Sequence, residues 1–178
     1  MKKQILVPVL IILIVAGMLL CMSFGLNKIA VANAQAEHQK IMETILPGST
    51  EFTVEPYAGD DANIRSVHKG ETGFVVETVT YGYAGDITML IGVTNEGKVT
   101  GLVVRDMSDT LGLGGNALTD HEFLAQFLNT SGEAEVGTNV DAISGATVTS
   151  KAITRSINSA VAYVTGADTD SGATAWGG

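Results

Sequence analysis

Three hydroxyl side chains and a pair of adjacent, very small residues gather in the segment DAISGATVT, which spans Asp141 to Thr149. The hydroxyls belong to Ser144, Thr147 and Thr149, and the small residues are Gly145 and Ala146. Because glycine and alanine leave the backbone uncovered, the chain can turn tightly here and admit a bulky group close to the main chain. The residue types therefore predict a ligand site at this segment.

The residues after this segment predict a helix. Apolar side chains recur on one face, at Val148, Ala152, Ile153, Ile157, Ala160, Val161 and Val164. A helix begins with unpaired N–H groups and the positive end of its dipole, which favour an anion such as phosphate. Ser or Thr before a helix is equally typical of an N-cap. The residues alone thus leave two interpretations, a phosphate site and a helix cap.

The elements that must position this segment are those of an α+β domain. Three runs rich in Val, Ile and Thr, at residues 74–80, 87–94 and 99–106, are joined by short turns and predict an antiparallel meander. The polar residues 49–71 have room for two further short strands. We therefore expect an antiparallel sheet with helices packed against it.

A second helix and an extended segment are expected between the sheet and the SGAT segment. Thr119 and Glu122 have capping-box spacing and predict a helix that carries Phe123, Leu124, Phe127 and Leu128 toward the core. Residues 135–143 predict a short extended approach to SGAT.

The N-terminal end predicts a membrane anchor. Residues 5–26 are 22 residues without a charge, long enough to cross a bilayer, and Lys2 and Lys3 before them predict a cytoplasmic N-terminus. A cleaved signal peptide is the alternative, because A-x-A sites follow at residues 30–34, although the apolar run is longer than a usual signal core.

The remaining boundaries follow from periodicity and composition. We expect residues 1–26 to form the cytoplasmic end and the anchor, 27–48 a helical stalk, 49–166 one domain outside the cytoplasm, and 167–178 a disordered tail.

Composition excludes several classes of function. Beyond residue 26 the chain has 8 Lys and Arg against 19 Asp and Glu, a balance that disfavours nucleic acid. Its one cysteine, Cys21, lies in the predicted span, so the domain has no thiolate metal site or disulfide, and His38, His68 and His121 lack the spacing of metal ligands. No catalytic triad or carboxylate pair is evident.

Four features together resemble a known family: the N-terminal anchor, YGYAGDITMLIGVTNEGKVTGLVV, DTLGLG and DAISGATVTS. The chain is similar to the FMN-binding domain of the G subunit of the Rnf electron-transport complex and of the C subunit of the sodium-translocating NADH:quinone oxidoreductase. The resemblance implies that Thr147 carries FMN through a phosphodiester bond, installed from FAD by a flavin transferase that recognises Asp141, Ser144, Gly145 and Ala146.

The resemblance also implies a loop beside the flavin ring. Where the family shows H-x-E-T-P-G-L-G, this chain has Met107-Ser108-Asp109-Thr110-Leu111-Gly112-Leu113-Gly114, so the His, the Glu and the Pro are replaced. The expected wall beside the flavin ring consists of Thr110, Leu111, Gly112, Leu113 and Gly114. Because Leu111 replaces the family's Pro, the backbone there is less restricted.

The function implied is electron transfer within an Rnf-type ion-translocating complex, with the other membrane subunits as partners. Two alternatives stay open: a free-standing anchored flavoprotein of another electron-transfer chain, and a non-redox binding module in which SGAT only caps a helix.

The pattern D-x-x-S-G-A-T returns 27 residues later as DTDSGAT, from Asp168 to Thr174, but the flanking residues differ, so no domain is repeated. The second copy is either a coincidence in a tail of small residues or a second attachment site at Thr174. Such a tail offers an accessible hydroxyl, but no following helix and no wall except Trp176.

Overall fold

The computed structural model describes residues 15, 17–18, 32–107, 120–131 and 134–167. The chain divides into two compact units between Lys40 and Ile41, and the second unit contains all of the labelled strands and helices. The helix formed by residues 32–45 contributes to both units.

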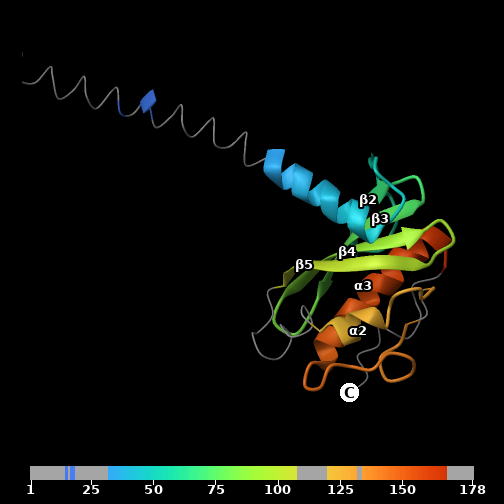
Figure 1. Cartoon of the computed structure of the whole chain (residues 1–178). Coiled ribbons are helices and arrows are strands. Elements are labelled where there is room, and N and C mark those ends of the chain that lie inside the picture. The colour runs from blue at the N-terminus through green and yellow to red at the C-terminus, as the bar shows by residue number, and fades with distance from the viewer. Residues whose placement is uncertain (1–14, 16, 19–31, 108–119, 132–133, 168–178) are drawn as a thin grey trace, which may run out of the picture. The chain divides into compact units, whose positions relative to one another are not determined.

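Five antiparallel strands form one sheet in the order β1-β2-β3-β4-β5 (Figure 1). They are β1 (Thr53–Glu55), β2 (Ile64–Lys69), β3 (Gly73–Tyr81), β4 (Asp86–Thr94) and β5 (Val99–Met107). Each strand pairs with its neighbour in sequence, because short turns leave the chain no room to cross over. The predicted antiparallel meander is confirmed, as are the two short strands before it.

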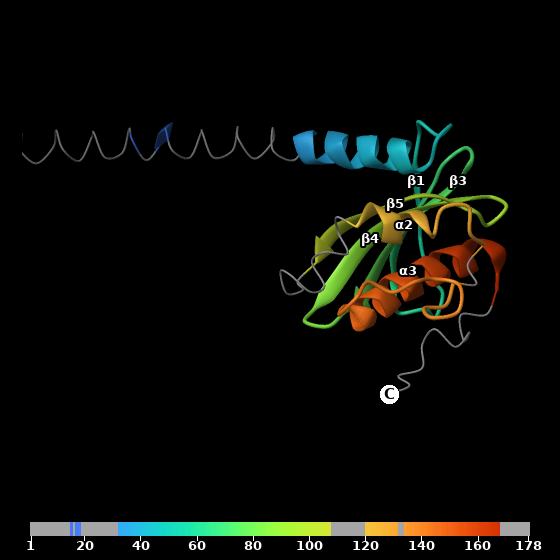
Figure 2. The same cartoon turned by 60° about the horizontal axis from the view of Figure 1, so that its bottom comes forward.

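The helix α3 (Thr147–Thr165) covers one face of the sheet (Figure 2). Ile153, Ile157 and Val161 are buried against inward-facing side chains of the strands, among them Ile91 and Val76. Small polar groups complete this layer: the Thr80 hydroxyl donates to the Ala152 carbonyl at 3.1 Å and bonds the Ser156 hydroxyl at 2.8 Å. The predicted apolar face of this helix is confirmed.

The end of the helix at residues 32–45 packs on the other face of the sheet. Met42, Ile45 and Leu46 are buried with Val75 and Leu90. The backbone of Ile45 lies directly on two glycines that face each other across the strands, Gly92 and Gly101. A Cβ atom at Gly92 would overlap the Ile45 carbonyl oxygen, and the Thr100 hydroxyl donates to that same oxygen at 2.6 Å. The last turn of the predicted stalk thus belongs to the core.

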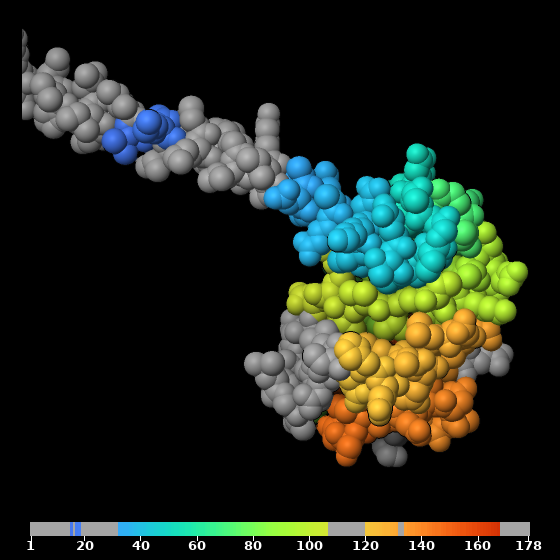
Figure 3. Space-filling view, viewed as in Figure 1, coloured from blue at the N-terminus to red at the C-terminus, as the bar shows by residue number. Residues whose placement is uncertain are grey.

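The helix α2 (His121–Ala125) is shorter than the sequence predicts. Its N-cap is Asp120, whose carboxylate accepts from the Phe123 N–H at 2.9 Å, so the predicted capping box is wrong. Phe123 and Phe127 are buried in the core, Leu124 packs partly against it, and Leu128 is 43% exposed, because the chain leaves the helix after Ala125. Figure 3 shows the segment 120–131 at the surface beside the strands.

Residues 135–140 form a turn, so the predicted extended segment 135–143 is wrong over this part. Val136 and Val140 form an isolated bridge, and the Glu135 N–H donates to the Asn139 side chain at 2.7 Å. Asn139 thus closes a turn just before the chain reaches SGAT.

Two sequence predictions fall largely on parts of the chain that the structure does not describe. The expected membrane span lies outside the described residues except for positions 15, 17 and 18, and the tail 168–178 lies wholly outside them. Among the helices of the described residues, none combines the length and the apolar character that crossing a membrane requires.

Candidate functional site

The SGAT segment leads directly into α3. Gly145 has φ 76°, a left-handed conformation that favours glycine, and this reversal brings the chain to the helix start. The N-cap is Ala146, and no side chain makes a capping hydrogen bond there. The interpretation of SGAT as a side-chain N-cap of this helix is therefore wrong.

Ser150 fixes the segment onto the helix. It is fully buried, and its hydroxyl accepts from the Ile143 N–H at 3.1 Å and donates to the Ala146 carbonyl at 3.0 Å. Ser150 was not predicted as a site residue, because its role depends on a contact with Ile143 that its residue type does not indicate. One buried hydroxyl thus connects the backbone before SGAT to the first turn of α3.

The three predicted hydroxyls separate into two kinds. Ser144 and Thr147 are exposed, and within the described residues neither hydroxyl has a hydrogen-bond partner. Thr149 is only 1% exposed and lies inside the domain. Ser144 and Thr147 therefore form the accessible part of the site, with Gly145 exposed between them and Ala146 buried beneath.

Gln126 holds the start of the segment. Its side-chain oxygen accepts from the Asp141 N–H at 2.8 Å, and its amide nitrogen donates to the Asp141 carbonyl at 3.2 Å. Because both bonds use the backbone of Asp141, its carboxylate stays exposed. Gln126 was not predicted, since the contact spans 15 residues of sequence. The segment is thus fastened at both ends, by Gln126 and by Ser150.

The electrostatics of the helix start favour an anion. The first turn of α3 contains no acidic residue, and its initial N–H groups have no carbonyl of a preceding turn to bond. Lys151 follows Thr147 by four residues, which places both on one side of the helix. Phosphate at the Thr147 hydroxyl would meet a positive helix end and a nearby ammonium group.

The sheet topology brings a second segment to the same end of the domain. Thr80 bonds Ala152 in the second turn of α3, and Thr80 pairs with Ile87, which pairs in turn with Met107 at the end of β5. The predicted wall of Thr110, Leu111, Gly112, Leu113 and Gly114 follows Met107, but these residues and Thr174 lie outside the described residues.

Among the described residues, no group of three or more His, Cys, Asp or Glu side chains is placed to hold a metal ion. The site is instead two exposed hydroxyls on a tight turn before a helix, in an α+β domain. These features make the segment a candidate site for a phosphate-bearing ligand.

The comparison with known proteins names that cofactor. Residues 82–162, from the turn after β3 to the last turns of α3, match the family model of the FMN-binding domain. The chain is 35% identical over 178 residues to the G subunit of the ion-translocating oxidoreductase complex of Methanosarcina acetivorans, a match that covers 90% of this chain and 93% of that protein. The chain belongs to this family of FMN-binding-domain proteins.

Two bacterial relatives are similar over shorter spans. The G subunit of the proton-translocating ferredoxin:NAD(+) oxidoreductase complex of Clostridium ljungdahlii is 37% identical over 99 residues, 52% of this chain and 53% of that protein. The G subunit of the Na(+)-translocating ferredoxin:NAD(+) oxidoreductase complex of Acetobacterium woodii is 31% identical over 133 residues, 69% of this chain and 61% of that protein.

Proposed function

We propose that this protein is a membrane-anchored electron-transfer subunit that carries FMN, attached to Thr147 by a phosphodiester bond. The observation that carries the proposal is the exposed Thr147 hydroxyl, which has no partner among the described residues and stands at the first residue of α3. FMN supplies one- and two-electron chemistry, while the protein fixes its position and surroundings.

The attachment needs a transferase and FAD as the co-reactant. The Thr147 oxygen attacks the FMN phosphorus of FAD, the phosphoanhydride bond breaks, AMP leaves, and the hydroxyl proton is released. Gly145 would allow the phosphate of the attached FMN to approach the backbone, and the N–H groups of the first turn of α3 would stabilise its charge. Ser144 provides a second hydroxyl at the surface, and Asp141 keeps its exposed carboxylate for recognition by the transferase.

Lys151 is expected to stabilise the attached phosphate. We expect Lys151→Gln to lower the free energy of unfolding of the FMN-bearing protein by about 0.5 kcal/mol more than that of the FMN-free Thr147→Val protein, since i,i+4 charge pairs contribute this much. Urea unfolding of both backgrounds measures the difference.

The matched control for Lys151 is Lys98→Gln. Lys98 pairs with Glu96 in the turn between β4 and β5 and should show the same effect in both backgrounds. Equal effects of Lys151→Gln with and without FMN would show that Lys151 does not contact the phosphate.

In this function, the protein would bind the other membrane subunits of an Rnf-type ion-translocating ferredoxin/NAD oxidoreductase. The support is the similarity to the three relatives named above. A free-standing flavoprotein would carry the same FMN without these partners, and copurification from the native membrane separates the two cases.

The topology follows from the charges that flank the apolar run. Lys2 and Lys3 favour a cytoplasmic N-terminus, so the sheet and α3 should face the other side of the membrane. Trypsin added to intact spheroplasts is expected to cleave the domain while a cytoplasmic marker stays whole. If trypsin cleaves the domain only after the membrane is permeabilised, the domain faces the cytoplasm and the proposed orientation is wrong.

The proposed function as a whole is tested on the full chain, coexpressed with a flavin transferase. We expect flavin fluorescence to remain on the denatured gel band, and the flavin absorbance of the native protein to bleach with dithionite and return on reoxidation. A dark band with intact protein would refute covalent attachment, and a flavin that cannot be reduced would refute electron transfer.

A further inference from the structure

A small pocket lies at the opposite end of α3 from Thr147. It has a volume of about 230 Å³ and is bordered by Tyr57, Asp60, Asp61, Ile64, Ser159, Ala162, Tyr163 and Ala167. The residues of α3 that border the pocket, from Ser159 to Tyr163, lie 12 to 16 residues after Thr147, which is roughly 18–24 Å along the helix at about 1.5 Å per residue. The pocket is therefore separate from the proposed flavin site.

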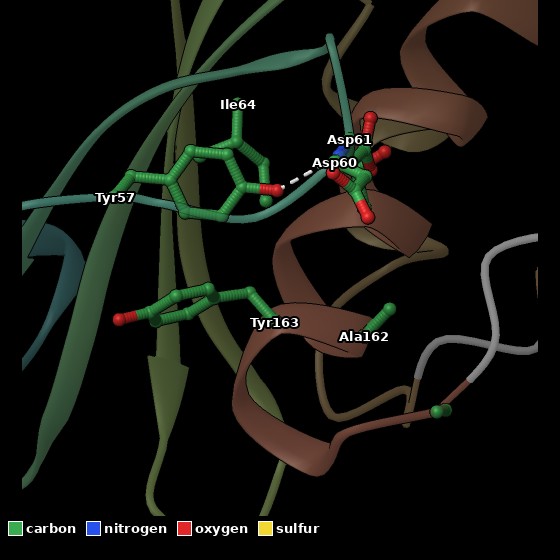
Figure 4. A pocket seen from close by; sticks show the side chains of 8 residues that line it. Tyr57, Asp60, Asp61, Ile64, Ala162 and Tyr163 are labelled. Atoms are coloured by element: carbon green, nitrogen blue, oxygen red, sulfur yellow. Dashed lines mark hydrogen bonds between the residues drawn. The ribbon is translucent and has the colours of Figure 1, made fainter.

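Two aromatic rings and two carboxylates border the same opening (Figure 4). The rings of Tyr57 and Tyr163 meet edge to face with centroids 5.8 Å apart. The Tyr163 hydroxyl donates to Glu55 at 3.1 Å, and burial followed by this carboxylate raises the pKa of Tyr163. The phenol stays neutral, so its ring is a fixed apolar wall that can face a cation.

Asp61 has an unsatisfied oxygen. Oδ1 accepts from the Asn63 N–H at 2.9 Å, whereas Oδ2 is buried and receives no hydrogen bond from any described residue. Burying a carboxylate oxygen without a hydrogen-bond donor costs free energy, so a donor from a bound partner would stabilise it. The ion pairs found among the described residues join Lys69 to Glu55 and Lys98 to Glu96, and neither reaches Asp60 or Asp61.

The end of α3 adds to the negative potential of the pocket. Ala162 and Tyr163 belong to its last turn, whose carbonyls form the negative end of the helix dipole, and this turn contains no basic residue. Carboxylates, a helix C-terminus and two aromatic rings thus converge, and each favours a cation by a different interaction.

We propose that this pocket binds an arginine side chain of a partner protein. Its volume is below the roughly 300–1,000 Å³ of sites for small-molecule ligands, but it suits one side chain. A planar guanidinium can lie against a tyrosine ring and donate to Asp61 at the same time. The negative charge of the chain, −9 overall, would draw such a partner. Docking here would leave the flavin end of the domain uncovered.

The first test uses N-acetyl-arginine amide and the full chain in detergent, followed by NMR of labelled tyrosine rings. We expect saturable shifts of Tyr57 and Tyr163 but not of Tyr81 and Tyr83, which are exposed in and beside the turn after β3. The neutral analogue N-acetyl-citrulline amide should cause no saturable shift. Equal shifts with citrulline, or no saturation with arginine, would overturn the proposal.

Substitutions in the pocket test which side chains contribute to arginine binding. Asp61→Asn keeps the bond to Asn63 and should weaken arginine binding about tenfold, the effect of losing one charge-assisted hydrogen bond. Asp86→Asn changes an exposed aspartate at the far end of the sheet and should leave binding unchanged. If Asp61→Asn does not fold, Tyr163→Leu and Tyr163→Phe form the test, with weakening expected only where the ring is lost. Equal binding in all variants would reject the pocket.

The final test concerns the partner itself. Asp61→Arg places a cation in the pocket and is expected to reduce copurification of the neighbouring membrane subunits, while FMN fluorescence on the denatured band stays unchanged. Full retention of those subunits would overturn the docking proposal. The fluorescence reports separately on the proposed function, since the pocket needs no flavin to bind arginine.

Discussion

Thr147→Val is expected to remove the covalent FMN from the folded domain. Valine keeps the shape of threonine but has no hydroxyl, so the phosphodiester bond cannot form. Mass spectrometry of the protein coexpressed with the transferase should find FMN on the wild-type peptide that contains Thr147 and none on the variant peptide. Thr147→Ser keeps a hydroxyl and should retain part of the loading.

The control is Thr165→Val at the other end of α3. Thr165 is exposed, and its hydroxyl donates to the Val161 carbonyl at 3.0 Å and accepts from the Ala167 N–H at 3.4 Å. Both contacts are far from Thr147, so FMN loading of Thr165→Val should equal that of the wild type. FMN found on a described threonine other than Thr147 would reject the assignment.

The Thr147→Val protein also decides between the two explanations of the second DxxSGAT. Residual flavin on the peptide that contains Thr174 would identify a second attachment site. A dark gel band and an unmodified C-terminal peptide would make the repeat a coincidence of composition.

Gly92→Val is expected to destabilise the domain by about 4 kcal/mol or more, because its Cβ would overlap the Ile45 backbone and lift the end of the helix from the sheet. Met42, Ile45 and Leu46 would lose much of their burial. For a domain of this size we expect the midpoint of thermal unfolding to fall by roughly 10 °C. Limited trypsin digestion should also cleave faster after Lys40.

The control is Gly137→Ala. Gly137 has φ 89° and open space around its Cα, so alanine should cost only the backbone strain, about 1 kcal/mol. A Gly92→Val protein as stable as Gly137→Ala would mean that the contact with Ile45 does not support the fold.

The sheet and α3 could be predicted because their signals are local. Val-, Ile- and Thr-rich runs separated by turn residues specify strands and their order, and α3 repeats its apolar residues at helical spacing. The second face of the sheet was not foreseen. Apolar periodicity in residues 27–46 predicts a helix but not its binding surface, and the fit of Ile45 against Gly92 and Gly101 exists only after folding.

The errors around α2 and the SGAT segment have physical causes. Thr119 and Asp120 both satisfy capping rules one residue apart, and the carboxylate of Asp120 makes the bond. The short loop before SGAT became a turn because Asn139 closes it on Glu135. Thr147 and Ser144 could be picked out by residue type, whereas the roles of Gln126 and Ser150 depend on backbone contacts that form only in the folded domain.

The two fastenings of the SGAT segment bear on the order of maturation. Gln126 and Ser150 can form their hydrogen bonds to the segment only after α2, α3 and the turn between them have folded. The conformational entropy of Thr147 is then lost when the domain folds, and not when the transferase binds it. A transferase that acts on this protein would meet a rigid substrate whose shape is already set, so folding would come first and loading second.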